Sequence, residues 1–224
     1  KRHKIPTARY QVVSSMEGAK AVIDSGDVGL PVVVKADGLA GGKGVSIVDN
    51  KAGALDVAQK LIENRQLGSA GTRLIFEEYL SGDEVSFFAL SDGHNVLPLV
   101  AAQDHKRALD NDEGPNTGGM GSICPATILN AETLKHIVKD VVHPTISGLA
   151  AEGRKYQGIL YAGLMLTAEG PKVLEFNVRL GDPEAQSLLP RLKSDLFPLL
   201  KEVSQGHLGQ HRLEWVRVTA GSVV

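Results

Sequence analysis

A glycine-rich segment between two short β-branched runs most constrains the fold of this chain. Residues 30–35 and 45–48 have the composition of strands, and four glycines fall within 38–44, in the segment that joins them. A glycine-rich loop between two consecutive strands is a β-hairpin. The segment is therefore neither a Walker A loop nor a dinucleotide-binding fingerprint, because both of those motifs open a helix.

Two lysines flank this predicted hairpin loop and indicate what it binds. Backbone N–H groups of glycines can approach an anion closely, since no side chain stands in the way. Lys35 at the end of the first strand and Lys43 in the loop add two positive charges. The alternative is a mobile surface hairpin with solvated lysines, and the pair of lysines favours a polyphosphate site over it.

A second polar pattern lies on a predicted strand at 172–178. Glu175, Asn177 and Arg179 are spaced two residues apart, so their side chains project from one face of that strand. Mg²⁺ prefers oxygen ligands, which a carboxylate and an amide supply, and a guanidinium beside the metal can hold a carboxylate or a phosphate. The alternative is the solvated face of an edge strand.

Acidic residues crowd the crossover between two predicted strands, at 73–80 and 84–90. Glu77, Glu78 and Glu84 stand there in otherwise apolar surroundings. Carboxylate and backbone carbonyl oxygens can accept hydrogen bonds from an adenine amino group, and a further acid can accept them from ribose hydroxyls. Ordinary charged residues at strand ends are the alternative interpretation.

Residues 103–121 are predicted to form a long loop, because they show no apolar periodicity and end in a cluster of glycines. Loops of that length inside a compact domain are usually functional or disordered. The density of charged and amide side chains favours a loop that contacts a substrate.

The remaining patterns mix helices with strands and predict an α+β fold. Helices are expected at 7–25, at 52–64, from a cap at Asn130 through a kink at Pro144, from a cap at Asp182, and from about Ser194; further strands are expected at 96–102, 161–167 and 215–218.

Composition excludes several classes of protein. The 224 residues carry a net charge of -2, which gives no electrostatic reason to expect a nucleic acid partner. No apolar run approaches the roughly 18 residues of a membrane span. Cys124 is the one cysteine, so a disulfide framework and a Cys-rich zinc site are excluded, and a reducing compartment, the cytoplasm, is expected.

Five motifs along the chain can be taken together. They are residues 31–44, 77–86, 103–107 (Gln-Asp-His-Lys-Arg), 114–121 (Gly-Pro-Asn-Thr-Gly-Gly-Met-Gly) and 173–184. These motifs resemble the ATP-grasp core of the glycinamide ribonucleotide synthetase (phosphoribosylamine–glycine ligase) family. The first and last are shared loosely with other ATP-grasp ligases, whereas the third and fourth narrow the resemblance to this family, and the likeness covers nearly the whole chain.

The resemblance implies an α+β ATP-grasp fold in which two subdomains with antiparallel sheets sandwich ATP. Residues 1–76 would form the small lid subdomain and 77–218 the large subdomain. Residues 219–224 would begin a truncated C-terminal domain, and an N-terminal domain would also lie outside this piece. Contacts to the phosphoribosylamine phosphate are expected mostly there, so this chain alone would bind ATP without turnover.

The resemblance also implies roles for individual residues. Catalytic roles fall on Arg179 and Lys43, and metal ligation on Glu175 and Asn177. ATP contacts are expected from Lys35, Lys43, Gly44, Glu77, Glu78, Tyr79, Leu80, Glu84 and Arg107. Substrate contacts are expected from Asp104, Lys106, Asn116, Thr117, Gly118, Arg179 and Asp182.

The implied reaction needs no protein nucleophile. With Mg²⁺ (or Mn²⁺), ATP would phosphorylate the carboxylate of glycine, and the amine of 5-phosphoribosylamine would displace phosphate to give an amide, in de novo purine biosynthesis. A monomer with these small-molecule substrates and no nucleic acid or membrane partner is expected. One departure from many ATP-grasp enzymes is the wholly apolar run 162–166, where a second metal-binding carboxylate often stands.

Two other readings remain open. Another ATP-grasp carboxylate–amine ligase or a purine-pathway carboxylase would use the same phosphate and metal groups with a different acceptor. A nucleotide-binding module without turnover would retain the ATP contacts alone.

Overall fold

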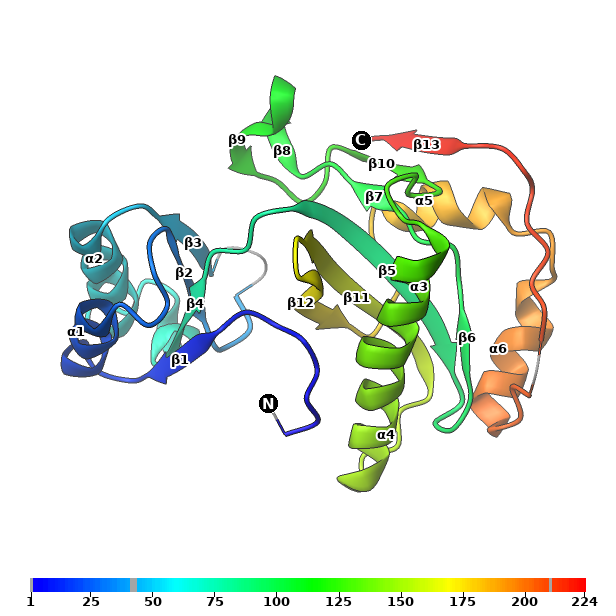
Figure 1. Cartoon of the computed structure of the whole chain (residues 1–224), viewed down its shortest axis with the longest axis horizontal. Helices are drawn as coiled ribbons and strands as arrows, with labels where there is room; N and C mark the ends of the chain where they lie inside the picture. Colours follow the sequence, from blue (N-terminus) through cyan, green and yellow to red (C-terminus); the bar gives the residue numbers. More distant parts are fainter. Residues whose placement is uncertain (1, 41–43, 210) are drawn as a thin grey trace. The chain divides into compact units, whose positions relative to one another are not determined.

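The computed structural model describes residues 2–40, 44–209 and 211–224, without the side chains of residues 112, 115 and 116. The chain forms two compact units, which are shown with their elements in Figure 1. One unit is Ala8–Leu80, and the other joins the residues up to Thr7 to Ser81–Val224. No helix in the described part of the chain is long and apolar enough to cross a bilayer.

The unit Ala8–Leu80 is one antiparallel sheet covered on one face by two helices. The strands run in the order β1-β4-β2-β3, and the glycine-rich segment joins β2 to β3, so the predicted hairpin is confirmed. Its elements are β1 (Tyr10–Val13), α1 (Met16–Ser25), β2 (Val32–Ala36), β3 (Val45–Val48), α2 (Lys51–Ile62), a 3₁₀ turn (Gly68–Gly71) and β4 (Leu74–Glu78).

Strand alternation divides this sheet into a buried face and an open face. Val34 and Phe76 are fully buried in a core with Ala54 and Ala58 of α2. Side chains at neighbouring positions in β2 and β4 therefore point to the opposite face, which α1 and α2 do not cover.

The helix expected at 7–25 is wrong in its first half. Tyr10–Val13 pairs with β4 as an edge strand, because a sheet offers these residues backbone partners and a place for β-branched side chains. The helix begins at Met16, after the N-cap Ser15, whose side chain accepts a hydrogen bond from the N–H of Gly18.

The second unit is built on the sheet β12-β11-β5-β6, again antiparallel throughout. One face packs on the long helical segment α3–α4 through Phe87, Ile137 and Leu164, and the other packs on α5 and α6 through Phe88 and Leu188 (Figure 1). The elements are β5 (Asp83–Ser91), β6 (Val96–Pro98), α3 (Ala131–His136), a π-helical turn (Ile137–Val142), α4 (His143–Ala151), β11 (Gly158–Thr167), β12 (Gly170–Asn177), α5 (Glu184–Leu188), a 3₁₀ turn (Leu189–Arg191) and α6 (Leu196–Gln205).

The loop expected at 103–121 is instead a folded hairpin attached to a small sheet. β7 (Gln103–Asp104), β10 (Gly121–Cys124) and β13 (Ala220–Val223) form a three-stranded sheet. β8 (Arg107–Leu109) and β9 (Glu113–Asn116) pair across a 3₁₀ turn at 110–112. Main-chain hydrogen bonds hold this hairpin together. Because its side chains are mostly polar, the sequence shows no apolar periodicity that would reveal the strands.

Three further expectations differ from the structure. The last strand is Ala220–Val223, within the expected 219–224 segment, and not 215–218, where Trp215 makes only an isolated bridge to Leu192. The N-cap of α5 is Pro183, and Asp182 accepts from the side chain of Gln186 instead. Ahead of Pro144 the helix widens into a π-helical turn, since proline lacks the N–H that an α-helical turn requires.

Asp92, at the turn between β5 and β6, is a fully buried carboxylate that fastens the end of α6 to the sheet. It accepts hydrogen bonds from the backbone N–H groups of His94, Asn95 and Leu208, at 2.9, 2.6 and 2.9 Å, and from the side chain of Asn95. Burial alone would raise the pKa of Asp92, but these hydrogen bonds outweigh it and hold the pKa below its ordinary value.

We expect Asp92→Ala to lower the free energy of unfolding by about 3 kcal/mol, because four donors lose a charged acceptor. Urea denaturation of the purified protein measures this, with exposed Asp83→Ala as the matched control. In the parent protein, the contribution of Asp92 should be lost as the pH falls below the ordinary range of a carboxyl group. Equal unfolding midpoints for the two variants would contradict the assignment.

Candidate functional site

The predicted metal-binding pair lies on β12 just beyond a β-bulge. Gly163 of β11 pairs with Glu175 and Leu164 pairs with Val173, so Leu174 is the extra residue between the two pairs. Bulges re-aim side chains and are frequent beside functional sites. Here Val173 remains in the core, while Glu175 turns to the exposed face.

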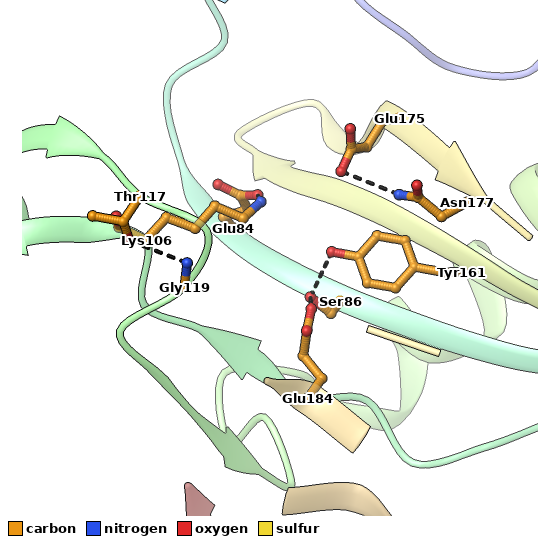
Figure 2. A network of polar contacts seen from close by, with 9 residues as sticks. All are labelled: Glu84, Ser86, Lys106, Thr117, Gly119, Tyr161, Glu175, Asn177 and Glu184. Carbon is orange, nitrogen blue, oxygen red and sulfur yellow. Dashed lines mark hydrogen bonds and ion pairs between the residues drawn. The ribbon is translucent and has the colours of Figure 1, made fainter. Parts of the chain in front are cut away.

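Glu175 and Asn177 lie side by side, as the spacing predicted. The amide nitrogen of Asn177 donates to Oε1 of Glu175 over 3.2 Å (Figure 2). Opposite them, a Cβ at Gly163 would lie 3.2 Å from Cγ of Glu175, so a glycine there leaves the carboxylate its space. A carboxylate beside an amide is a donor set that suits a hard cation such as Mg²⁺, once the amide turns its oxygen inward.

The described residues hold no group of three or more His, Cys, Asp or Glu side chains that could bind a metal. A cation on Glu175 and Asn177 would therefore take its other ligands from phosphate oxygens and water. Mg²⁺ commonly binds in this way, with one or two protein carboxylates and several waters.

A polar network covers the same face of the sheet beside this pair. Lys106, from the segment between β7 and β8, forms an ion pair with Glu84 of β5. Burial alone would lower the pKa of Lys106, but Glu84 above all, with Tyr161 and Glu175, holds the pKa above its ordinary value. The ammonium group therefore stays charged at neutral pH.

A short chain of hydrogen bonds lies beside the metal-binding pair. Ser86 donates from Oγ to Oε1 of the buried Glu184 over 2.7 Å, and its Oγ lies 3.0 Å from the hydroxyl of Tyr161. Burial raises the pKa of Tyr161 well above its ordinary value, so the phenol is neutral at physiological pH. Tyr161 pairs in register with Asn177, so this chain of hydrogen bonds lies on the same face of the sheet as the pair.

Asp104, at the end of β7, is a carboxyl group of this face whose pKa is shifted toward neutral pH. Its Oδ1 is buried and has no hydrogen-bond partner among the described residues. Burial, followed by the charges of Glu184 and Glu84, raises the pKa of Asp104 to about 7, although Lys106 and the N–H of His105 act against the shift.

The hairpin from 105 to 120 holds Lys106 by its backbone. The N–H and the hydroxyl of Thr117 both donate to the carbonyl oxygen of Lys106, over 2.7 and 2.8 Å. The N–H of Gly119 donates to the Thr117 hydroxyl over 3.1 Å (Figure 2). Arg107 donates to the carbonyl of Gly114, Gly118 is exposed, and the side chain of Asn116 lies outside the described part of the structure.

In the other unit, Lys35 and Glu77 rise from the open face of the sheet. Nζ of Lys35 lies 2.6 Å from Oε2 of Glu77, and both side chains are largely buried. Glu78 accepts from both the backbone and the side chain of Arg9. Gly44 is buried and its carbonyl accepts from Ala36 N–H, whereas Lys43 lies outside the described residues.

The two remaining site residues of the second unit have local partners. Arg179, beyond the end of β12, is exposed and donates to the carbonyl of Leu180. Asp182 is exposed and pairs with Gln186. At the end of the unit Ala8–Leu80, Tyr79 is exposed at 43% and Leu80 is buried.

Sequence reasoning missed Ser86, Tyr161 and Glu184 as members of the site. A signal for Ser86 exists, because it stands two residues after Glu84 and therefore on the same face of the strand. No signal places Glu184 against Ser86, since 98 residues separate them and only the packing of α5 joins them.

The chain matches the family described as "Phosphoribosylglycinamide synthetase, ATP-grasp (A) domain" over residues 1–185. It is 52% identical over 215 residues to the phosphoribosylamine–glycine ligase of Allochromatium vinosum, covering 96% of this chain and 50% of that protein. It is 45% identical over 225 residues to the chloroplastic phosphoribosylamine–glycine ligase of Arabidopsis thaliana, covering 100% of this chain and 42% of the relative. The chain thus spans about half the length of the curated relatives it matches.

Solved structures agree with the sequence comparisons. The crystal structure of phosphoribosylamine–glycine ligase from Thermotoga maritima superposes with a TM-score of 0.90 at 36% identity, over 99% of this chain and 55% of that one. N5-carboxyaminoimidazole ribonucleotide synthetase from Thermus thermophilus superposes with a TM-score of 0.69 at 18% identity, over 99% and 53% of the chains, which shows a shared fold. The α+β ATP-grasp fold expected from the motifs is confirmed.

We expect Asp104→Asn to change how stability depends on pH. The carboxyl group titrates near 3.8 when unfolded and near 7 when folded, so its contribution is fully present below pH 4 and is lost as the pH rises through 7. The variant cannot ionise, so its free energy of unfolding relative to the parent should rise between pH 4 and 8.

Urea denaturation across that pH range tests this expectation, with exposed Asp110→Asn as the control. A difference between variant and parent that does not change with pH would show that Asp104 titrates normally.

Proposed function

The chain belongs to the phosphoribosylglycinamide synthetase ATP-grasp domain family, and from this membership we propose that the full-length protein is an ATP-dependent ligase. It would join the carboxylate of glycine to the amine of 5-phosphoribosylamine, giving glycinamide ribonucleotide, ADP and phosphate in purine biosynthesis. Relatives named phosphoribosylamine–glycine ligase at 45–52% identity support the proposal. The observation that carries it is the Glu175–Asn177 pair on the same sheet face as the Lys106–Glu84 ion pair.

The lid subdomain, expected at 1–76, is proposed to be the unit Ala8–Leu80, and the large subdomain, expected at 77–218, to be the other unit. Lys35, with Lys43 and the glycine hairpin, would bind phosphate oxygens. Glu77 and the backbone from Glu78 to Leu80 would accept from the adenine amino group. The close pair of Lys35 and Glu77 supports this, because the two opposite charges compensate each other in a largely buried place until a ligand offers new partners.

Glu175 and Asn177 would hold the divalent cation, Mg²⁺ or Mn²⁺. The cation would neutralise negative charge on the phosphate oxygens of ATP. The side-by-side carboxylate and amide support this assignment, and the bulge at Leu174 supplies their exposure. Glu84 would contact the ribose, and Arg107 would contact the nucleotide from the hairpin.

The chain's own residues would work by holding anions in place. A carboxylate oxygen of glycine attacks the terminal phosphorus of ATP, the bond to the β-phosphate oxygen breaks, and ADP leaves. Arg179 and Lys106 would balance the charge of the resulting acyl phosphate. Asn116, Thr117, Gly118 and Asp182 would orient the substrates, and Asp104 would contact the acceptor amine. Positioning and fixed charges supply most of the rate enhancement in such transfers.

The rest of the full-length protein would complete the acceptor site. The chain spans about half of its relatives, so contacts to the phosphate of phosphoribosylamine are proposed to lie in the other half. We propose that the protein is a monomer. We also propose that it works in a reducing compartment, since Cys124 is a free, buried thiol. The Arabidopsis relative is named as chloroplastic, so the compartment need not be the cytoplasm in every relative.

The proposal is tested with full-length protein, ATP, glycine and phosphoribosylamine. Release of phosphate should require both glycine and the amine, and product analysis should show one amide per ADP. Turnover with another acceptor would favour a different ATP-grasp ligase or a purine-pathway carboxylase. Nucleotide binding without any turnover would favour a binding module.

We expect Glu175→Ala to lower the turnover of the full-length enzyme by at least roughly 10²-fold, because the cation loses its one charged protein ligand. Raising the Mg²⁺ concentration should restore part of the loss, which a disrupted fold would not allow. Exposed Glu132→Ala provides the matched control. Unchanged activity and metal dependence in Glu175→Ala would remove the metal assignment.

We expect Lys35→Ala to weaken ATP binding about tenfold, or about 1.4 kcal/mol, because a charge-assisted contact to phosphate is lost. Isothermal titration with ATP measures the change, and titration with adenosine should show a smaller one. Exposed Lys20→Ala should leave both affinities unaltered. Equal weakening of ATP and adenosine would mean that Lys35 does not contact phosphate.

A further inference from the structure

Asp104 occupies a position on the proposed active face that substrate contact alone does not explain. The residue is half-buried, and its Oδ1 has no hydrogen-bond partner among the described residues. A carboxylate oxygen in that state is desolvated and uncompensated, which destabilises the charged form. The carboxyl group is therefore ready to take up a proton.

Neighbouring residues pack closely around Oδ1 of Asp104. A Cβ at Gly119 would lie only 3.1 Å from Oδ1 of Asp104 and 2.5 Å from Cδ of Pro183, so a glycine in the hairpin is required there. Pro183 in turn begins α5, which carries the buried Glu184.

The charged groups that face Asp104 come from α5, from β5 and from the segment that follows β7. Glu184 on α5 and Glu84 on β5 favour the protonated form, and Lys106, two residues along its own chain segment, favours the ionised form. Lys106 is already paired with Glu84, so its charge is shared (Figure 2). The pKa of about 7 that results is the value at which a proton acceptor works best at neutral pH.

We propose that the carboxylate of Asp104 accepts the proton that the acceptor amine loses when it becomes an amide nitrogen, an inference that rests on the proposed ligase function. In this step the nitrogen lone pair forms the bond to the acyl carbon. The bond from that carbon to the phosphate oxygen breaks, and phosphate leaves with the electron pair. The proton on nitrogen passes to Asp104, so charges and atoms balance.

The inference separates the two half-reactions. Formation of the acyl phosphate from ATP and glycine releases no proton from an amine, so it does not need Asp104. Attack by the amine does. Lys106, held by Thr117 and paired with Glu84, would stay with the phosphate throughout.

Rapid-quench single turnovers of the full-length enzyme test this with Asp104→Asn. ADP should form at close to the parent rate, whereas the amide should form roughly 10²-fold more slowly, within the range of general-base effects. Hydroxylamine, added with ATP and glycine alone, should still be converted to glycyl hydroxamate. Asp110→Asn, on the same hairpin, is the matched control.

Each other outcome overturns the inference in a distinguishable way. If Asp104→Asn loses ADP formation and regains it at high glycine concentration, Asp104 binds glycine. If amide formation is unchanged, Asp104 has no role in the second half-reaction. If the parent enzyme itself yields no hydroxamate and no ADP with glycine, the proposed ligase function fails as well.

The pH dependence supplies a readout that does not depend on the folding of that variant. In the parent enzyme, the rate of amide formation should fall on the acid side with a midpoint near pH 7, while ADP formation should not. Glu184→Gln, which keeps an acceptor for Ser86 but removes the charge, should move that midpoint to lower pH. A midpoint that stays in place in Glu184→Gln would overturn the inference.

Discussion

The register of β11 between its two neighbours is the constraint on which the site depends. Gly163 faces Ser86 of β5 on one side and Glu175 of β12 on the other. Residues directly opposite one another in an antiparallel sheet share a face, so this one alignment gathers the metal-binding pair and the Ser86–Glu184 chain. A slip of β11 by one residue would turn Tyr161 to the opposite face, away from Ser86 and Asn177, because the side-chain period of a strand is two.

The sheet face that carries Glu175 and Asn177 holds more carboxyl groups than ammonium groups. Glu84, Glu175 and Asp104 surround Lys106, which is the cation that the charges of this face most strongly stabilise. Nearby carboxylates cannot all remain ionised cheaply around a single ammonium group. The face therefore favours cationic ligands on one side, such as a metal ion, and a protonated carboxyl on the other.

Local patterns predicted the parts of the site that lie on one strand, and the motifs predicted the family and the fold. The spacing of Glu175 and Asn177 and the hairpin after Lys35 follow from strand periodicity and glycine content, and both are confirmed. The hairpin within 103–121 was not predicted, because its strands are held by main-chain hydrogen bonds. Glu184 was not predicted either, because its contact with Ser86 exists only after α5 has packed.

The last described strand has a consequence for where this polypeptide can be divided. β13 pairs with β10, which pairs in turn with β7, the strand that ends in Asp104. Ser222 also bonds to Ser122 and to the carbonyl of Pro183 at the start of α5. Cutting the chain upstream of residue 220 would therefore leave β10 as an unpaired sheet edge, open to pairing with other chains. It would also remove one strand of the small sheet that holds β7, and with it Asp104, in place.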